Sequence, residues 1–341
     1  MNVTEFIIDT YGAGTPLVAT AKRYRPSTAT KKGYILIFAH GTGFQQIKST
    51  GSQLSNACMP TGGPVVEAWA IDSQTHGAAA TLNRDAIDEP GFTYSSYHFA
   101  EACANLCKIH LNGTRHPIVL VGHSAGAASA ALVPSFYGRS GTPPFSALIL
   151  IEPAIWPGSM IDMADSPAYK LACVAIPRRR KTWGSRDAVR KDLGKRAPWG
   201  MWDKRILDIY VVGKVCRRFT PAESTRNTAS RRTRKGCPSG VVLLHESQPF
   251  INQINAVYPV AELDKLRKKV PVHLVYGERN DLFTREKQES LLRGRRFASV
   301  TRIPGAGHLV VQEAPDAVGD VLLSILGGLE NQRYVEREYV L

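Results

Sequence analysis

Short apolar runs alternate with amphipathic stretches along most of the chain. Runs such as YILIFA, PIVLVG and ALILI are continuously apolar, which is typical of strands buried on both faces of a parallel sheet. The pattern predicts eight strands, at 4–8, 17–23, 34–39, 65–71, 118–121, 147–151, 272–276 and 298–303. Helices are predicted at 97–110, 125–136 and 316–326. We therefore expect an α/β fold with an open, mostly parallel sheet covered by helices, and an active site at the carboxyl ends of its strands.

The alternation stops between residues 155 and 269. This segment holds four of the five tryptophans and helix-like pieces such as SRDAVRKDL and WDKRILDIY. It predicts a helical lid inserted over the strand ends, so that residues 1–154 and 270–341 form the core and residues 155–269 the lid. Inside the lid, residues 214–240 contain few core-forming side chains, which predicts a basic flexible loop. A retained intron in the gene model is the alternative explanation for that stretch.

The excess of positive charge lies in the same insert. The chain has 43 basic and 29 acidic residues, and 19 of the basic but only 5 of the acidic residues fall between Arg178 and Lys235. The remainder of the chain is neutral, with 24 of each sign. This local basicity, without a nucleic-acid-binding module, argues against nucleic-acid or anionic-surface binding as the main role.

Three further features narrow the class of protein. No apolar run approaches the roughly 20 residues that a membrane-spanning helix needs. The beginning MNVTEFIIDTYG lacks the basic and apolar regions of a signal peptide. Six irregularly spaced cysteines predict core or idle thiols rather than a disulfide framework or a zinc site. No cofactor or metal is expected.

The strongest chemical motif is Gly122-His123-Ser124-Ala125-Gly126, between a predicted buried strand and a predicted helix. In this strand–turn–helix setting G-x-S-x-G raises a serine hydroxyl at the top of the sheet, and the tight turn demands glycine at its flanks. The N-terminus of the following helix offers backbone N–H groups to a developing oxyanion. Ser124 is therefore the candidate nucleophile, against the alternative of a structural turn.

A serine needs a base, and a second N–H group would complete the oxyanion hole. His308, in IPGAGHLVVQEAP after the last predicted strand, is the candidate base, because histidine follows serine in the chain order of this fold class. His40-Gly41-Thr42-Gly43-Phe44 follows the strand YILIFA. We expect the N–H of Thr42 or of Gly43 to face the site beside that of Ala125, with Thr42 preferred.

Five segments in this order resemble the α/β-hydrolase superfamily: GYILIFAHGTGF, AWAIDSQTHG, IVLVGHSAGA, HLVYGERNDLF and IPGAGHLVVQEAP. The resemblance covers most of the chain outside the lid. The lid segment further resembles a group of fungal hydrolases found in gene clusters for secondary metabolites and host toxins. Members of that group are similar to ester and acyl-thioester hydrolases and are often peroxisomal.

The resemblance leaves two candidates for the acid that orients the histidine. In the commonest arrangement of the superfamily an aspartate follows the seventh strand, but here Gly277-Glu278-Arg279-Asn280-Asp281 aligns Asn280 with that position. Some members take the acid from the sixth strand, where this chain has Glu152. We favour Glu152 over Asp281, which could serve only if its loop shifts. Asp72 and His76 are expected to shape a loop.

These observations predict a serine hydrolase that cleaves an ester or acyl-thioester through Ser124, His308 and an acid, in secondary-metabolite biosynthesis. A catalytically silent auxiliary protein with the same fold is the alternative. The lid tryptophans suggest a small apolar acyl substrate, or else form the core of the lid. Arg178, Arg179, Arg180 and Lys181 could pair with the phosphates of a coenzyme A thioester. The cytoplasm is the default location, because the chain does not end in the S-K-L tripeptide of peroxisomal relatives.

Overall fold

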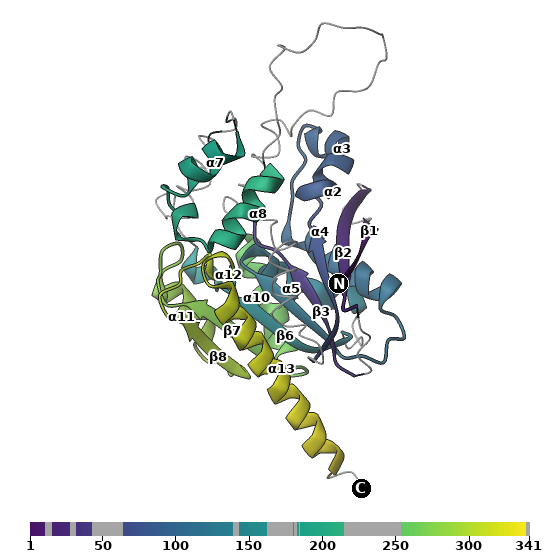
Figure 1. Cartoon of the computed structure of the whole chain (residues 1–341). Helices are drawn as coiled ribbons and strands as arrows, with labels where there is room; N and C mark the ends of the chain where they lie inside the picture. The colour runs from purple at the N-terminus through teal and green to yellow at the C-terminus, as the bar shows by residue number, and fades with distance from the viewer. Residues whose placement is uncertain are drawn as a thin grey trace, which may run out of the picture.

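Eight strands of the described chain form one sheet in the computed structural model (Figure 1), in the order β1-β2-β4-β3-β5-β6-β7-β8. The structure describes residues 1–10, 16–27, 32–42, 64–138, 143–161, 180, 183, 185–214 and 254–338. The strands are β1 Asn2–Thr10, β2 Leu17–Arg25, β3 Tyr34–Ala39, β4 Val65–Asp72, β5 Ile118–His123, β6 Phe145–Ile151, β7 Val272–Gly277 and β8 Ser299–Ile303. β2 pairs antiparallel with β1 and with β4, and all other pairs are parallel. The predicted eight-stranded, mostly parallel sheet is confirmed.

Helices cover both faces of the sheet. They are α2 Gly77–Leu82, α3 Arg84–Asp88, α4 Ser96–His110, α5 Ala125–Leu132, α7 Arg186–Leu193, α8 Lys204–Lys214, α10 Ile254–Leu266, α11 Arg285–Leu292, α12 Val310–Glu313 and α13 Pro315–Glu338. Single 3₁₀ turns occupy Val133–Tyr137, Gly158–Met160 and Trp199–Met201. None of these helices, within the part of the chain that is described, is long and apolar enough to cross a membrane.

Alternate side chains of each central strand enter two separate cores. In β3, Ile35 and Ile37 join a core formed with α4, α5 and α10, whereas Leu36 and Phe38 join a core formed with α12 and α13. This division explains the continuously apolar central strands, because neither of their faces meets water. Cys103 and Cys107 of α4 lie in the first core, where burial raises the pKa of both thiols.

The described residues of the predicted lid have two different environments. α7 and α8 form their own apolar cluster at the end of the molecule opposite to the projecting end of α13 (Figure 1). α10, by contrast, packs its Leu263 and Leu266 into the core against the sheet. Most of the predicted basic loop, 215–240, lies outside the described residues.

Candidate active site

Ser124 lies in a sharp turn between β5 and α5, with a φ of 53° that is unusual for a residue with a side chain. The turn admits only glycine at its flanks. A Cβ atom on Gly122 would lie 2.6 Å from the Cα of Ala127, and one on Gly126 would overlap the carbonyl oxygens of Ala39 and His40. The backbone itself therefore forces the G-x-S-x-G spacing.

Three buried side chains form a continuous hydrogen-bonded chain. His308 Nε2 lies 2.9 Å from Ser124 Oγ, and His308 Nδ1 lies 3.1 Å from Glu152 Oε2. Each of the three residues is at most 4% exposed. Because an ionised carboxylate only accepts hydrogen bonds, Nδ1 carries the proton and Nε2 presents its lone pair to the serine hydroxyl. This is the tautomer that can take a proton from Ser124.

The two candidate acids reach different parts of His308. Glu152, directly after β6, contacts the imidazole ring, whereas Asp281 Oδ1 accepts a hydrogen bond of 2.8 Å from the backbone N–H of His308. Arg279 bridges Asp281 to Glu313, at 3.3 and 2.7 Å.

Two further backbone N–H groups in residues 304–309, which we call the histidine loop, donate to Glu278 and Glu313. Gly305 N donates to Glu278 at 2.8 Å, and Gly307 N donates to Glu313 at 2.9 Å. The acids of the segment after β7, Glu278 and Asp281, therefore restrain the backbone of the histidine loop rather than the imidazole ring.

His123, the variable residue of the serine motif, holds the other side of the histidine loop. Its Nε2 lies 3.0 Å from the carbonyl oxygen of His308, so Nε2 carries the proton and donates. Burial, and then the nearby His308, lower the pKa of His123 to about 3. His123 therefore stays neutral at working pH and acts as a fixed hydrogen-bond donor.

The loop after β3 passes directly over the serine. A Cβ atom on Gly41 would lie 3.1 Å from the Cβ of Ser124 and 3.0 Å from Nδ1 of His123, so a larger residue there would crowd the serine and His123. Thr42 follows and is buried. Ala125 occupies the first position of α5, where its N–H has no partner within the helix. Gly43, the alternative to Thr42, lies outside the described residues.

Asp72 and His76 have structural surroundings, as expected for residues that shape a loop. Asp72 accepts a hydrogen bond from Thr20 at 3.4 Å, and His76 Nδ1 lies 2.8 Å from Ser73 Oγ. Gly77 has a φ of +57°, and a Cβ atom there would overlap Asp72. The part of the chain that the structure describes contains no group of three or more His, Cys, Asp or Glu side chains that could hold a metal ion.

Apolar side chains lie beside His308 and its neighbour Leu309. The Phe283 ring packs edge-on against the His308 ring, with 4.7 Å between the ring centroids. It also packs edge-on against Trp156, at 5.1 Å between centroids. Leu309, next to His308, packs into the cluster of α7 and α8 together with Trp199 and Trp202. The latter two tryptophans thus contribute to the core of the predicted lid, while Trp156 packs outside that cluster. Of the four consecutive cations predicted to meet a coenzyme A group, Arg178, Arg179 and Lys181 lie outside the described residues, and Arg180 lies over Trp183.

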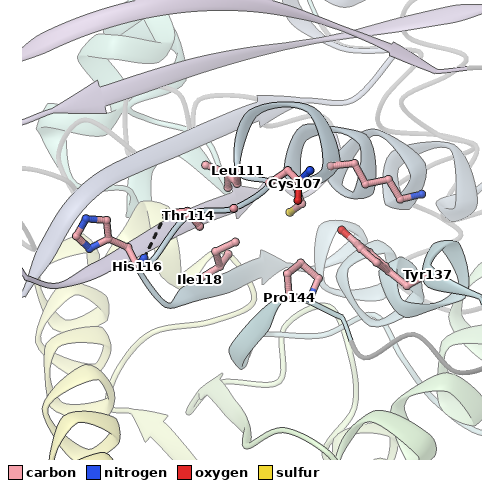
Figure 2. A pocket seen from close by; sticks show the side chains of 10 residues that line it. Cys107, Leu111, Thr114, His116, Ile118, Tyr137 and Pro144 are labelled. Carbon is pink, nitrogen blue, oxygen red and sulfur yellow. Dashed lines mark hydrogen bonds between the residues drawn. The ribbon is translucent and has the colours of Figure 1, made fainter.

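A cavity of about 280 Å³ lies elsewhere in the molecule (Figure 2). Its wall includes Ile118, the first residue of β5, and Pro144, just before β6, with Cys107 and Tyr137 on the side of α4. Ser124 follows the opposite end of β5, so this cavity is separated from the candidate active site by the length of a strand. Burial raises the pKa of Cys107 to about 12, which leaves the thiol protonated and unreactive.

Sequence reasoning missed three neighbours of the site: His123, Phe283 and Gln288. His123 was visible inside the serine motif, but its contact with a carbonyl 185 residues away leaves no local signal. Phe283 and Gln288 lie in a stretch for which no helix was predicted. Gln288 donates from Nε2 to Glu152 Oε1 at 3.3 Å.

Comparisons with known proteins agree with this architecture. The sequence profile of the alpha/beta hydrolase family matches residues 36–321. A peroxisomal α/β-hydrolase from Saccharomyces cerevisiae superposes with a TM-score of 0.73 at 17% identity, covering 97% of this chain and 89% of that one. E-2-(acetamidomethylene)succinate hydrolase superposes with a TM-score of 0.63 at 17% identity, covering 95% of this chain and 98% of that one. The thioesterase domain from the curacin biosynthetic pathway superposes with a TM-score of 0.57 at 16% identity, covering 95% of this chain and 100% of that domain. No curated protein matches the sequence significantly.

Proposed function

Because this chain belongs to the α/β-hydrolase family, we propose that it is a serine hydrolase that cleaves an ester or an acyl-thioester. One observation carries the proposal: the hydrogen-bonded chain from Ser124 through His308 to Glu152. A serine with its hydroxyl 2.9 Å from an unprotonated imidazole nitrogen is arranged for nucleophilic attack.

In this mechanism Ser124 Oγ bonds to the carbonyl carbon of the substrate while His308 Nε2 takes the hydroxyl proton. The bond to the leaving alcohol or thiol then breaks, and His308 passes that proton to the leaving group. Water repeats the sequence on the acyl-enzyme and releases the acid. Glu152 holds the Nδ1–H tautomer and stabilises the imidazolium that forms in each step.

The backbone N–H groups of Ala125 and Thr42 form the oxyanion hole in this proposal, with Gly43 as the alternative to Thr42. Two features support it: the close passage of Gly41 over Ser124, and the place of Ala125 at the start of α5, where its N–H has no partner within the helix. Such donors stabilise the developing oxyanion more than the planar ground-state carbonyl.

The substrate we propose has a small apolar acyl group, and a helical lid over residues 155–269 covers it. The apolar contacts of Phe283 with His308, and of Leu309 with the cluster of α7 and α8, support an apolar acyl site. The proposal that coenzyme A is the leaving group is supported only by the basic sequence at residues 178–181.

A role in fungal secondary-metabolite biosynthesis rests on the resemblance of the lid sequence, and the likeness to the curacin thioesterase domain is compatible with it. We keep the cytoplasm as the proposed location, although the Saccharomyces relative is peroxisomal.

The first experiment treats the purified protein with a fluorophosphonate probe and maps the labelled residue by mass spectrometry. We expect labelling at Ser124 and none in Ser124→Ala. Esters and acyl-coenzyme A compounds are then screened with the same pair of proteins. If the folded wild-type protein is not labelled and hydrolyses neither class, the silent auxiliary protein replaces this proposal.

A further inference from the structure

The carboxylate of Glu152 receives hydrogen bonds on both of its oxygens. Oε2 accepts from His308, and Oε1 accepts from the backbone N–H of Gly277 at 2.7 Å and from Gln288 Nε2 at 3.3 Å. Glu152 is 1% exposed and Gln288 is 5% exposed. A carboxylate removed from water needs such donors to remain charged. Gln288, from α11, is the side-chain donor on the oxygen that faces away from the histidine.

Arg302 determines which end of the Gln288 amide faces Glu152. Its guanidinium donates to Gln288 Oε1 at 2.7 Å from β8. Because arginine has no acceptor, the amide oxygen must face Arg302, and the NH₂ group must face the carboxylate. The hydrogen bonds of this network therefore have fixed directions: Arg302 donates to Gln288, and Gln288 and His308 both donate to Glu152.

The charged groups around Arg302 and Gln288 are consistent with Arg302 acting as the hydrogen-bond donor. Burial, followed by the charge of Arg285, lowers the pKa of Arg302, but an arginine still remains a cation and a donor. Tyr276 lies under the Arg302 guanidinium at 5.0 Å, and burial with the nearby Glu152 charge raises the pKa of its phenol. Tyr276 therefore stays neutral, and Glu289 is the further acid whose charge reaches Arg302.

A glutamate in this position needs more restraint than an aspartate would. Its side chain has one more rotatable bond, and its backbone has a φ of 45°, outside the usual range for a residue with a side chain. The hydrogen bond from Gly277 N–H alone holds Oε1 in place but lets the carboxylate rotate about it. A second hydrogen bond to Oε1, from Gln288 of α11, fixes the plane of the carboxylate and therefore the direction in which Oε2 points toward His308.

We propose that Gln288, oriented by Arg302, is a positioning residue that holds the Glu152 carboxylate in line with His308. The inference rests on the proposed serine hydrolase function and adds a group that acts through Glu152 without touching the substrate. Nothing in the sequence motif around Glu152 predicts it.

The experiment measures inactivation by a fluorophosphonate and hydrolysis of p-nitrophenyl acetate for four proteins: wild type, Gln288→Met, Gln288→Glu and the exposed control Glu286→Gln. We expect Gln288→Met to lower kcat and the maximal inactivation rate about 10-fold, with KM and the half-saturating probe concentration within about 2-fold. Glu286→Gln, on the same helix, should match the wild type. Thermal melting confirms that each variant is folded.

Gln288→Glu separates positioning from packing. The new carboxylate keeps the acceptor for Arg302 but repels Glu152, so its loss should exceed that of Gln288→Met at neutral pH. When the new carboxyl group is protonated it again offers one acceptor and one donor, as the amide does. The ratio of variant to wild-type activity should therefore rise as the pH falls, which lost packing alone would not cause.

Three outcomes overturn the inference. If the wild type is labelled but Gln288→Met reacts at the same rate, the positioning role fails while the proposed function stands. A Gln288→Glu ratio that does not change with pH likewise restricts Gln288 to packing. If the wild type itself neither reacts with the probe nor hydrolyses the ester, the proposed function fails and the positioning role with it.

Discussion

The ends of β6 and β7 both send carboxylates to His308, but to different parts of it. Glu152, after β6, contacts the imidazole ring, and the acids that follow β7 contact the backbone of the histidine loop. The first contact sets the tautomer and charge of the ring, and the second sets where the ring stands. Two similar carboxylates at adjacent strand ends therefore act on different parts of one residue, one on the ring and the other on the backbone. Matching acid-to-amide substitutions at the two positions should separate these effects.

The largest effect is expected for Glu152→Gln. This change keeps the size of the side chain but replaces a charged acceptor by a neutral amide, so the Nδ1–H tautomer and the imidazolium lose their support. We expect kcat to fall about 10³- to 10⁴-fold with little change in KM. Steady-state hydrolysis of an ester measures it, and circular dichroism controls for folding. If the Glu152→Gln variant kept nearly wild-type activity, Glu152 would not be the catalytic acid, and Asp281 would be the remaining candidate.

A much smaller effect is expected for the matching change Asp281→Asn. An asparagine oxygen can still accept the hydrogen bond from the His308 N–H, so kcat should change less than about 3-fold. Asp281→Ala removes the acceptor and should lower kcat about 10-fold. The same ester assay measures both variants. A loss as large for Asp281→Asn as for Glu152→Gln would contradict the division between ring and backbone.

The smallest effect concerns stability rather than rate, and it tests the donor on the opposite side of the histidine loop. The pKa of His123 is lowered to about 3 in the folded protein, against about 6.5 when unfolded. Between these values the unfolded chain binds a proton that the native state excludes, so the free energy of unfolding falls as the pH falls. The contribution approaches 1.4 kcal/mol per pH unit below about pH 6.

His123→Gln removes this titration while keeping an N–H donor for the His308 carbonyl. Urea unfolding of both proteins at about pH 8, 6 and 5 should therefore show the wild type losing stability relative to the variant as the pH decreases. Parallel stability profiles would show that His123 is protonated in the native state as readily as in the unfolded chain.

Much of the fold follows from local patterns. The central strands were predictable because both of their faces are buried. α4 was predictable from its apolar residues, and α5 from the run of helix-forming residues after the serine motif. α10 and α11 were not predicted, because α10 follows a long stretch of irregular pattern and carries an internal proline, Pro259. α11 is short and mostly polar, with the sequence REKQESLL, and only Leu291 and Leu292 at its end pack into the apolar core.

The candidate site divides in the same way. Ser124, Ala125 and Thr42 could be named as candidates from the sequence because strand ends and glycine turns have sequence signatures. The contacts of Glu152, Gln288 and His123 were not derivable, because each joins residues more than 100 positions apart. Sequence reasoning could name Glu152 only as one of two acids, and three-dimensional proximity is what distinguishes their surroundings.

Among the described residues, the two non-glycine residues with a positive φ are Ser124 and Glu152, and they follow adjacent strands. Such conformations cost on the order of 1–3 kcal/mol each, and glycine relieves the cost. Replacement by glycine would relieve this backbone strain at both positions, but at Glu152 it would also leave the buried N–H groups of Gly277 and Gln288 without their acceptor. The native chain therefore carries backbone strain at the two positions whose side chains contact His308, and a glycine at position 124 would be expected to raise the free energy of unfolding while removing the hydroxyl.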